Sequence, residues 1–274
     1  MLSLSVMFAY GFMSRALLVG AAVGILAALL GLPLVLRHDS MLTDGLSHLG
    51  FGVVTLAVAC GLTQPLWLAL PAVAVGSLWL LHLNEHSRLH PDTAVALISA
   101  TALATGVAVT SLTSGLSVDT CNFLFGSLLS LTPSDVILSL LVCAVMLLLL
   151  LWYRRPLFTL TLDRDFAAAA GLSVRRYQAL TAICTGLLIV IGMRLLGVML
   201  IGSLLIFPAA SGLQISRSYG QIQLWGILFN LLSIFLGLVF SFILNASTGA
   251  VIVLVEASIF LCCWCFRVWR EAIW

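Results

Sequence analysis

The residues best suited to chemistry are an acid and a histidine, four positions apart in a largely apolar chain. Asp44 and His48 lie in the segment Arg37-His-Asp-Ser-Met-Leu-Thr-Asp-Gly-Leu-Ser-His48. On a helix, residues with this spacing project from one face, so the carboxylate and the imidazole would lie side by side. Such oxygen and nitrogen donors can bind a divalent transition metal. The alternative interpretation is a helix-capping aspartate with a histidine near the lipid headgroups.

A second group of ionisable residues follows in the series His82, His86 and His90, with Glu85 and Asp92 nearby. If this segment is helical, the spacing aligns three imidazoles on one stripe, where they could receive a metal ion. A polar loop with titrating histidines is the alternative.

The elements that must position these residues are predicted to be membrane-spanning helices. The chain has 274 residues, of which 62% are hydrophobic and 8% charged. Apolar runs of about 20 residues cross a bilayer as helices, because the lipid offers the backbone no hydrogen-bond partners. We therefore predict an all-α polytopic membrane protein with eight or nine transmembrane helices and a single domain over residues 1–274. The apolar runs are 16–36, 46–62, 66–81, 93–112, 136–153, 177–193, 195–213, 222–244 and 250–266.

The arginines predict an orientation, because basic residues concentrate in cytoplasmic loops. If the polar segment 154–176 is cytoplasmic, ten of the twelve basic residues lie on that side, and Arg15 and Arg194 are the exceptions. The amino terminus is then outside the cell membrane and the carboxyl terminus inside. The formal net charge of +2 comes from these loop arginines and does not indicate nucleic-acid binding.

Three residues interrupt the apolar runs. Arg194 and Glu256 are charged residues at membrane depth, where charges usually form pairs or face water. We predict that Glu256 pairs with Arg194 or with a neighbouring subunit, and a water-filled cavity is the alternative. Pro208 removes a helical hydrogen bond and is predicted to kink a helix beside a path through the membrane.

The polar segment 154–176 is predicted to contain a short helix. Asp163 is placed to cap its start and Gly171 to end it, and between them lie Asp165, Ala167 and Ala168. A short helix with a small-residue face could dock into a groove of a partner protein. An ordinary surface connector is the alternative.

A series of segments, in the same order along the chain, carries a resemblance to one family. They are 12–17, 37–48 with its Asp-x-Leu-Ser-His, 92–96, 123–129, 163–171, 194–211 and 247–250. Together they resemble the permease subunit of bacterial ABC importers for zinc, manganese or iron, the ABC-3 family. Two departures from the family pattern are Gly52-Val53, in place of Pro-Gly, and Asn245-Ala-Ser-Thr-Gly249, in place of Asp-x-Pro-Thr-Gly.

The resemblance implies a type II-like ABC importer permease that is not itself an enzyme and holds no permanent cofactor. It implies three partners: a second copy of the chain, a cytoplasmic ATPase dimer and an extracytoplasmic metal-binding protein. Asp44 and His48 would contact the transported ion, and the segment 163–171 would be the coupling helix that meets the ATPase. The chain has no Gly-x-x-x-x-Gly-Lys-Ser/Thr motif for binding ATP phosphates.

Two other classes of protein are weighed against this one. A permease for a metal chelate such as a siderophore would have a longer chain and no need of an Asp-His pair. An intramembrane metalloprotease would need a fuller ligand set such as His-Glu-x-x-His, which is absent from the sequence.

Overall fold

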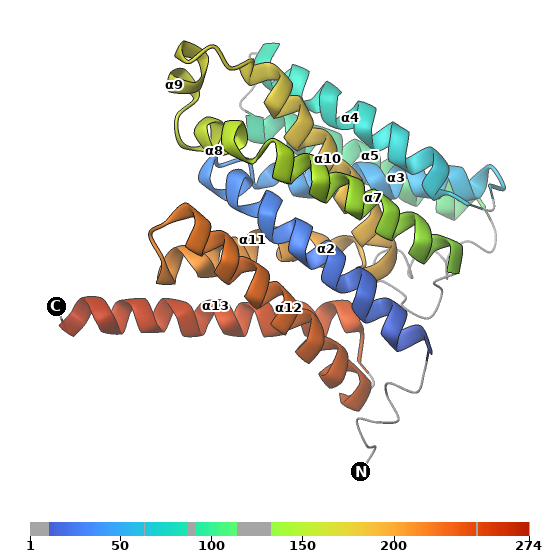
Figure 1. The fold of residues 1–274 in the computed structure, drawn as a ribbon. Coiled ribbons are helices and arrows are strands. Elements are labelled where there is room, and N and C mark those ends of the chain that lie inside the picture. The colour runs from blue at the N-terminus through green and yellow to red at the C-terminus, as the bar shows by residue number, and fades with distance from the viewer. Residues whose placement is uncertain (1–10, 63, 87–90, 114–132, 245, 274) are drawn as a thin grey trace.

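The computed structural model describes residues 11–62, 64–86, 91–113, 133–244 and 246–273, and every regular element in these ranges is a helix (Figure 1). Eight of the described helices are long and apolar enough to cross a membrane, and α11 is a shorter ninth. This confirms the prediction of an all-α polytopic membrane protein. These nine apolar helices are α2 (Gly11–Leu36), α3 (Met41–Ala59), α4 (Leu66–His86), α5 (Pro91–Leu112), α7 (Pro133–Trp152), α10 (Val174–Leu196), α11 (Val198–Ile215), α12 (Tyr219–Leu244) and α13 (Thr248–Ile273). Two short helices, α8 (Arg154–Leu162) and α9 (Arg164–Ala169), follow α7.

Helix α2 lies at the centre of the bundle, in contact with α7, α10, α11 and α12 (Figure 1). Its side chains at Val19, Val23 and Ala27 are completely buried. At Gly31, any Cβ atom would collide with the backbone carbonyl oxygen of Leu205 on α11. Small residues allow transmembrane helices to approach this closely, so Gly31 permits the close contact between α2 and α11.

Helices α11, α12 and α13 pack as neighbours in the carboxyl-terminal part of the chain. Helix α11 continues through Pro208, although proline has no N–H to donate to the carbonyl oxygen of Leu204 one turn earlier. Asn230 of α12 supplies that donor: its Nδ2 lies 3.1 Å from the Leu204 oxygen and 2.8 Å from the oxygen of Gly24 on α2. One buried amide therefore ties three helices together and satisfies the carbonyl that Pro208 leaves unpaired.

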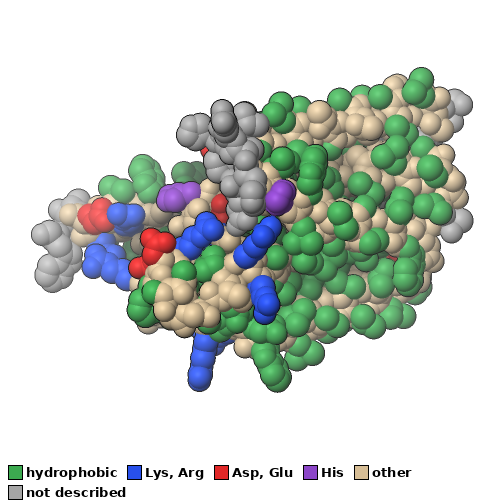
Figure 2. Space-filling view, turned by 90° about the horizontal axis from the view of Figure 1, so that it is seen from above, with side chains coloured by type: hydrophobic (Ala, Val, Ile, Leu, Met, Phe, Trp, Pro, Cys, Tyr) green, Lys and Arg blue, Asp and Glu red, His purple; other side chains and the backbone are tan. Residues whose placement is uncertain are grey.

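Charged side chains gather at the end of the bundle that carries α9, which we call the α9 end. Figure 2 shows them toward one end of the visible face, whereas hydrophobic side chains cover most of the remainder. Two contacts join helix termini at this end: Arg175 of α10 lies 3.5 Å from His82 of α4, and Arg267 of α13 donates to Gln214 of α11 at 3.1 Å. The rest of this face is apolar, as expected for a protein surface in contact with lipid.

Candidate ion site and coupling helix

Asp44 and His48 both lie near the start of α3, one turn apart and on one face. His48 Nε2 is 3.5 Å from Asp44 Oδ1, which confirms the predicted side-by-side arrangement. The Asp44 side chain is 65% exposed and that of His48 is 23% exposed, so the pair opens away from the protomer. The carboxylate is in the first turn of α3, where the helix dipole favours a negative charge.

The two ring nitrogens of His48 differ in their surroundings. Its Nδ1 is buried and has no hydrogen-bond partner among the residues that the structure describes. A metal ion on Nε2 requires the proton on Nδ1, and tight metal sites give that proton an acceptor.

Helix α3, which carries the pair, packs closely against α5. Any Cβ at Gly52 would stand 2.8 Å from the backbone oxygen of Ala102, and one at Gly45 would stand 2.7 Å from Val95 Cγ1. Two glycines thus let α3 and α5 pack in close contact. Gly52, where the family pattern has proline, leaves α3 continuous from Met41 to Ala59.

The turn between α2 and α3 carries charges that link it to α9. His38 adopts the left-handed backbone conformation, with φ of 58°, and Arg37 pairs with Asp39 at 3.2 Å. Burial raises the pKa of Asp39 above its ordinary value, while the guanidinium groups of Arg37 and Arg164 act to lower it. Arg164 is the first residue of α9, so its charge acts on the turn that leads directly into α3. Sequence analysis missed this electrostatic interaction, because nothing in the spacing of the two segments indicates it.

Helix α9 has the capped form that the sequence predicts. One carboxylate oxygen of Asp163 accepts the backbone N–H groups of Asp165 and Phe166, each at 2.9 Å. Gly171, with φ of +80°, follows the end of the helix. Ala167 is completely buried against the protein, whereas Ala168 is exposed. Phe166, which sequence analysis did not select, is 63% exposed, and an aromatic side chain on a short projecting helix is a suitable anchor for a partner protein.

The histidine series is only partly within the described residues. His82 and His86 lie one turn apart near the end of α4, and His90 is outside the described residues. The guanidinium of Arg175 beside His82 Nδ1 would repel a metal ion at that imidazole. Within the described residues, no group of three or more His, Cys, Asp or Glu side chains could hold a metal. A three-histidine site stays a prediction.

Glu256 is buried in the middle part of α13, with 2% of its surface exposed. Neither carboxyl oxygen has a hydrogen-bond partner among the described residues. Ser203 of α11 faces the carboxyl group, but its hydroxyl donates to the carbonyl oxygen of Leu200 at 2.7 Å. Arg194 lies near the end of α10, before the chain turns at Gly197. Its side chain is not among those described, so the pairing with Glu256 stays a prediction.

Comparison with known proteins places the chain in a family. The sequence model of the ABC 3 transport family matches residues 9–267, nearly the whole chain, and the protein therefore belongs to that family. This confirms the resemblance that the ordered segments indicated.

Several relatives are similar over most of their length. The chain is 27% identical over 266 residues to the manganese transport system membrane protein MntC of Listeria innocua, covering 97% of this chain and 94% of the relative. It is 28% identical to the high-affinity zinc uptake system membrane protein ZnuB of Haemophilus influenzae, over 90% of this chain and 94% of the relative. A probable iron transport system membrane protein of Haemophilus influenzae is 30% identical, with 92% of each chain covered.

Two solved structures are similar in fold. PsaBC from Streptococcus pneumoniae in complex with Fab superimposes with a TM-score of 0.83 and 28% identity, over 93% of this chain and 91% of that chain. An inward-facing conformation of a metal-chelate type ABC transporter gives a TM-score of 0.73 at 17% identity, covering 92% of this chain and 85% of that one. At that identity the second likeness shows the fold alone.

Proposed function

We propose that this chain is the membrane permease of an ATP-driven importer for a first-row divalent metal: Mn²⁺, Zn²⁺ or Fe²⁺. Membership of the ABC 3 transport family supports the permease role, and similar proteins are named for manganese, zinc and iron transport. The observation that carries the metal is the Asp44–His48 pair, with its nitrogen and oxygen 3.5 Å apart on an exposed helix face. One carboxylate and one imidazole suit all three ions, so the pair does not choose among them.

A single protomer gives an ion too few ligands. Transition metals take about four to six donors, whereas Asp44 and His48 supply two side chains. Because the Asp44 carboxylate is 65% exposed on the isolated protomer, a second copy could bring its own pair to the same ion. We propose a homodimer in which α3 of each protomer lines the path between them, with water completing the ion's coordination.

The driving force would come from separate cytoplasmic ATPase subunits that dock on α9. The exposed Phe166 and Ala168 form the contact surface, and the Asp163 cap holds the helix in shape. Movement of α9 would reach the ion site through Arg164, whose charge acts on Asp39 in the turn before α3. Transport would then follow from rigid-body movement of helices rather than from local unfolding.

The proposed orientation places the α9 end in the cytoplasm. Four arginines from different segments lie there. The charges of Arg37 and Arg164 act on each other, Arg175 lies beside His82 near the end of α4, and Arg267 donates to Gln214 near the end of α11. Positive charge of this kind concentrates on the cytoplasmic side of membrane proteins. The carboxyl terminus would then be inside, and an extracytoplasmic metal-binding protein would dock at the opposite end.

Metal uptake tests this function directly. Cells without other high-affinity metal uptake would express the complete transporter and be supplied with radiolabelled Mn²⁺, Zn²⁺ or Fe²⁺. We expect Asp44→Asn and His48→Ala each to reduce uptake of the same ion by more than about tenfold. Leu56→Ala is the matched control, because Leu56 is also exposed on α3 but offers no ligand.

Co-purification of the ATPase would establish that each variant assembles. Near-normal uptake in both Asp44→Asn and His48→Ala would contradict the proposal. So would a wild-type transporter that accumulates none of the three ions.

A further inference from the structure

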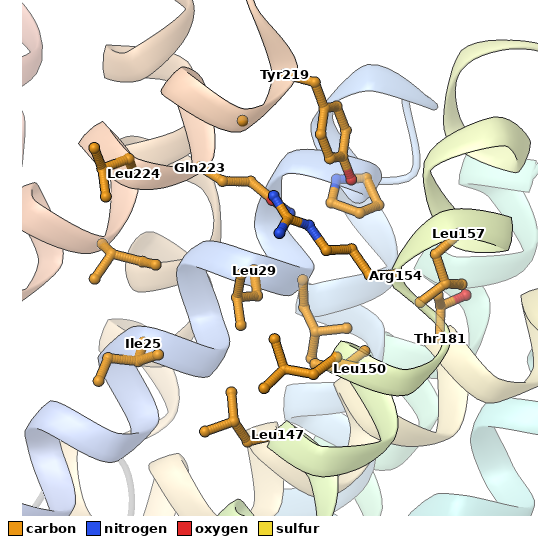
Figure 3. A pocket seen from close by; sticks show the side chains of 15 residues that line it. Ile25, Leu29, Leu147, Leu150, Arg154, Leu157, Thr181, Tyr219, Gln223 and Leu224 are labelled. Atoms are coloured by element: carbon orange, nitrogen blue, oxygen red, sulfur yellow. The ribbon is translucent and has the colours of Figure 1, made fainter.

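A pocket lies on the side of the bundle between α7 and α12, with α2 as its floor (Figure 3). Its volume is about 310 Å³, at the lower end of the range for small-molecule sites. Leucine and isoleucine side chains form most of its walls, including Leu29 of α2, Leu147 of α7 and Ile227 of α12. Leu151 and Leu224 also line it and are 53% and 58% exposed, so the pocket opens on the apolar surface of the protein.

The lining changes from polar to apolar along the helix axes. Arg154, Tyr219 and Gln223 lie together at one end, and Ile25 and Leu147 lie toward the other (Figure 3). The polar end of the pocket is at the α9 end of the bundle. Arg154 is the first residue of α8, which leads into α9, and Tyr219 is the first residue of α12. From Tyr219 to Ile227 the helix rises by about 12 Å, close to the ~15 Å of one hydrocarbon leaflet. The pocket therefore has the polarity and depth of one lipid leaflet.

The positive charge at the polar end is available to a ligand. Arg154 is exposed and pairs with no carboxylate among the described residues. Its Nη2 lies close to the backbone at the start of α12, 3.9 Å from the position that a Cβ would take on Gly220. A guanidinium offers two parallel donors to a phosphate oxygen pair. At the edge of a bilayer, the phosphate within reach of such a group is a lipid headgroup.

We infer that this pocket binds an anionic phospholipid from the leaflet at the α9 end. Its phosphate contacts Arg154, and part of one acyl chain lies between α7 and α12 over Leu29. The charge favours an anionic headgroup over a zwitterionic one, and the apolar opening admits a ligand from lipid rather than from water. Naming that leaflet cytoplasmic depends on the orientation in the proposed function, but the binding site itself does not.

The position of Arg154 gives this lipid a role in coupling. Arg154 is the first residue of α8, and α8 leads through Asp163 into α9. A headgroup held between Arg154 and the start of α12 would fix the base of the segment that carries α9. This consequence rests on the proposed docking of the ATPase at α9, whereas the lipid site rests on the pocket alone.

Native mass spectrometry of the purified transporter complex tests the site. The complex would be titrated with phosphatidylglycerol, with phosphatidylcholine of the same acyl chains, and with inorganic phosphate. We expect wild type to prefer phosphatidylglycerol, and Arg154→Gln to bind it about tenfold more weakly because a charge-assisted hydrogen bond is lost. Arg155→Gln is the matched control: it removes the neighbouring charge, which does not line the pocket.

A second variant tests the apolar end. Ile227→Trp would fill the space for the acyl chain and leave Arg154 in place, so it should also lose the lipid. Equal binding of the two phospholipids by wild type, or equal loss in Arg154→Gln and Arg155→Gln, would overturn the inference. Competition by inorganic phosphate at comparable concentrations would overturn it too, because it would indicate an anion site that is not specific for lipid.

Uptake assays separate this inference from the proposed function. If lipid binding depends on Arg154 while wild-type cells import no metal, the lipid site stands and the proposed function fails. If the metal is imported but Arg154→Gln retains phosphatidylglycerol with wild-type affinity, the lipid inference fails alone.

Discussion

The cap of α9 allows coupling to be weakened without a change at the ion site. Asp163→Ala removes two hydrogen bonds to the backbone N–H groups of Asp165 and Phe166, each 2.9 Å long. Loss of an N-cap costs about 1 kcal/mol, which corresponds to about a fivefold change in an equilibrium constant. Helix α9 has six residues, and a helix this short is marginal on its own. The fraction of permease with a helical α9 should therefore fall by up to about fivefold, and affinity for the ATPase should fall with it.

Binding of the purified ATPase to the permease in lipid nanodiscs measures this effect. Asp163→Ser is the matched control, because serine keeps the capping oxygen and loses the charge. We expect Asp163→Ser to bind like wild type and Asp163→Ala to bind up to about fivefold more weakly, with the thermal stability of the rest of the permease unchanged. The reasoning is refuted if Asp163→Ala binds like wild type, or if Asp163→Ser is equally weak, which would assign the effect to the charge.

Three further predictions concern the packing around α11, and each is measured by thermal unfolding of the detergent-solubilised protein. Asn230→Leu should destabilise it by about 1–3 kcal/mol, because two buried carbonyl oxygens lose a donor; adding Pro208→Ala should recover part of the loss, and strict additivity would contradict the assignment. Gly31→Ala should destabilise by roughly 1–3 kcal/mol through its clash with α11, whereas Gly202→Ala, where a Cβ has space, should be tolerated. Glu256→Gln should leave stability unchanged or higher, because it removes a buried acid that has no hydrogen-bond partner among the described residues; abolished metal uptake in this variant would instead show that the carboxylate takes part in transport.

Much of the architecture could be predicted from the sequence, because a bilayer restricts the options for a polypeptide. Each of the nine apolar runs corresponds to one of the nine apolar helices, including the seventh run, which became α11. The α9 cap was also predictable, since Asp163 and Gly171 act on residues close to them in the chain. The same holds for Asp44 and His48, whose proximity depends only on one helical turn.

Contacts between helices could not be predicted in this way. Hydropathy does not indicate which face of a nearly uniform apolar helix meets which neighbour. The amide of Asn230 therefore gave no signal of its bond to Leu204, and Arg164 gave none of its effect on Asp39. The pocket beside Arg154 is formed by α2, α7 and α12, which are far apart in the sequence.

Some predictions concern residues outside the described ranges, and others concern the side of the membrane on which each chain terminus lies. His90 and the resemblance at 123–129 belong to segments that are not described. An external amino terminus and a cytoplasmic carboxyl terminus stay predictions from the arginine distribution.

The central claim is that the transported ion contacts Asp44 and His48, and pulsed electron paramagnetic resonance tests it most directly. Mn²⁺ bound to the purified complex would serve as the probe ion, because a coordinated imidazole nitrogen gives a hyperfine coupling to the metal. We expect this nitrogen coupling in wild type, its loss in His48→Ala, and its retention in His82→Ala. A coupling that persists in His48→Ala, or that is absent from wild type with Mn²⁺ bound, would contradict the assignment of the ion site.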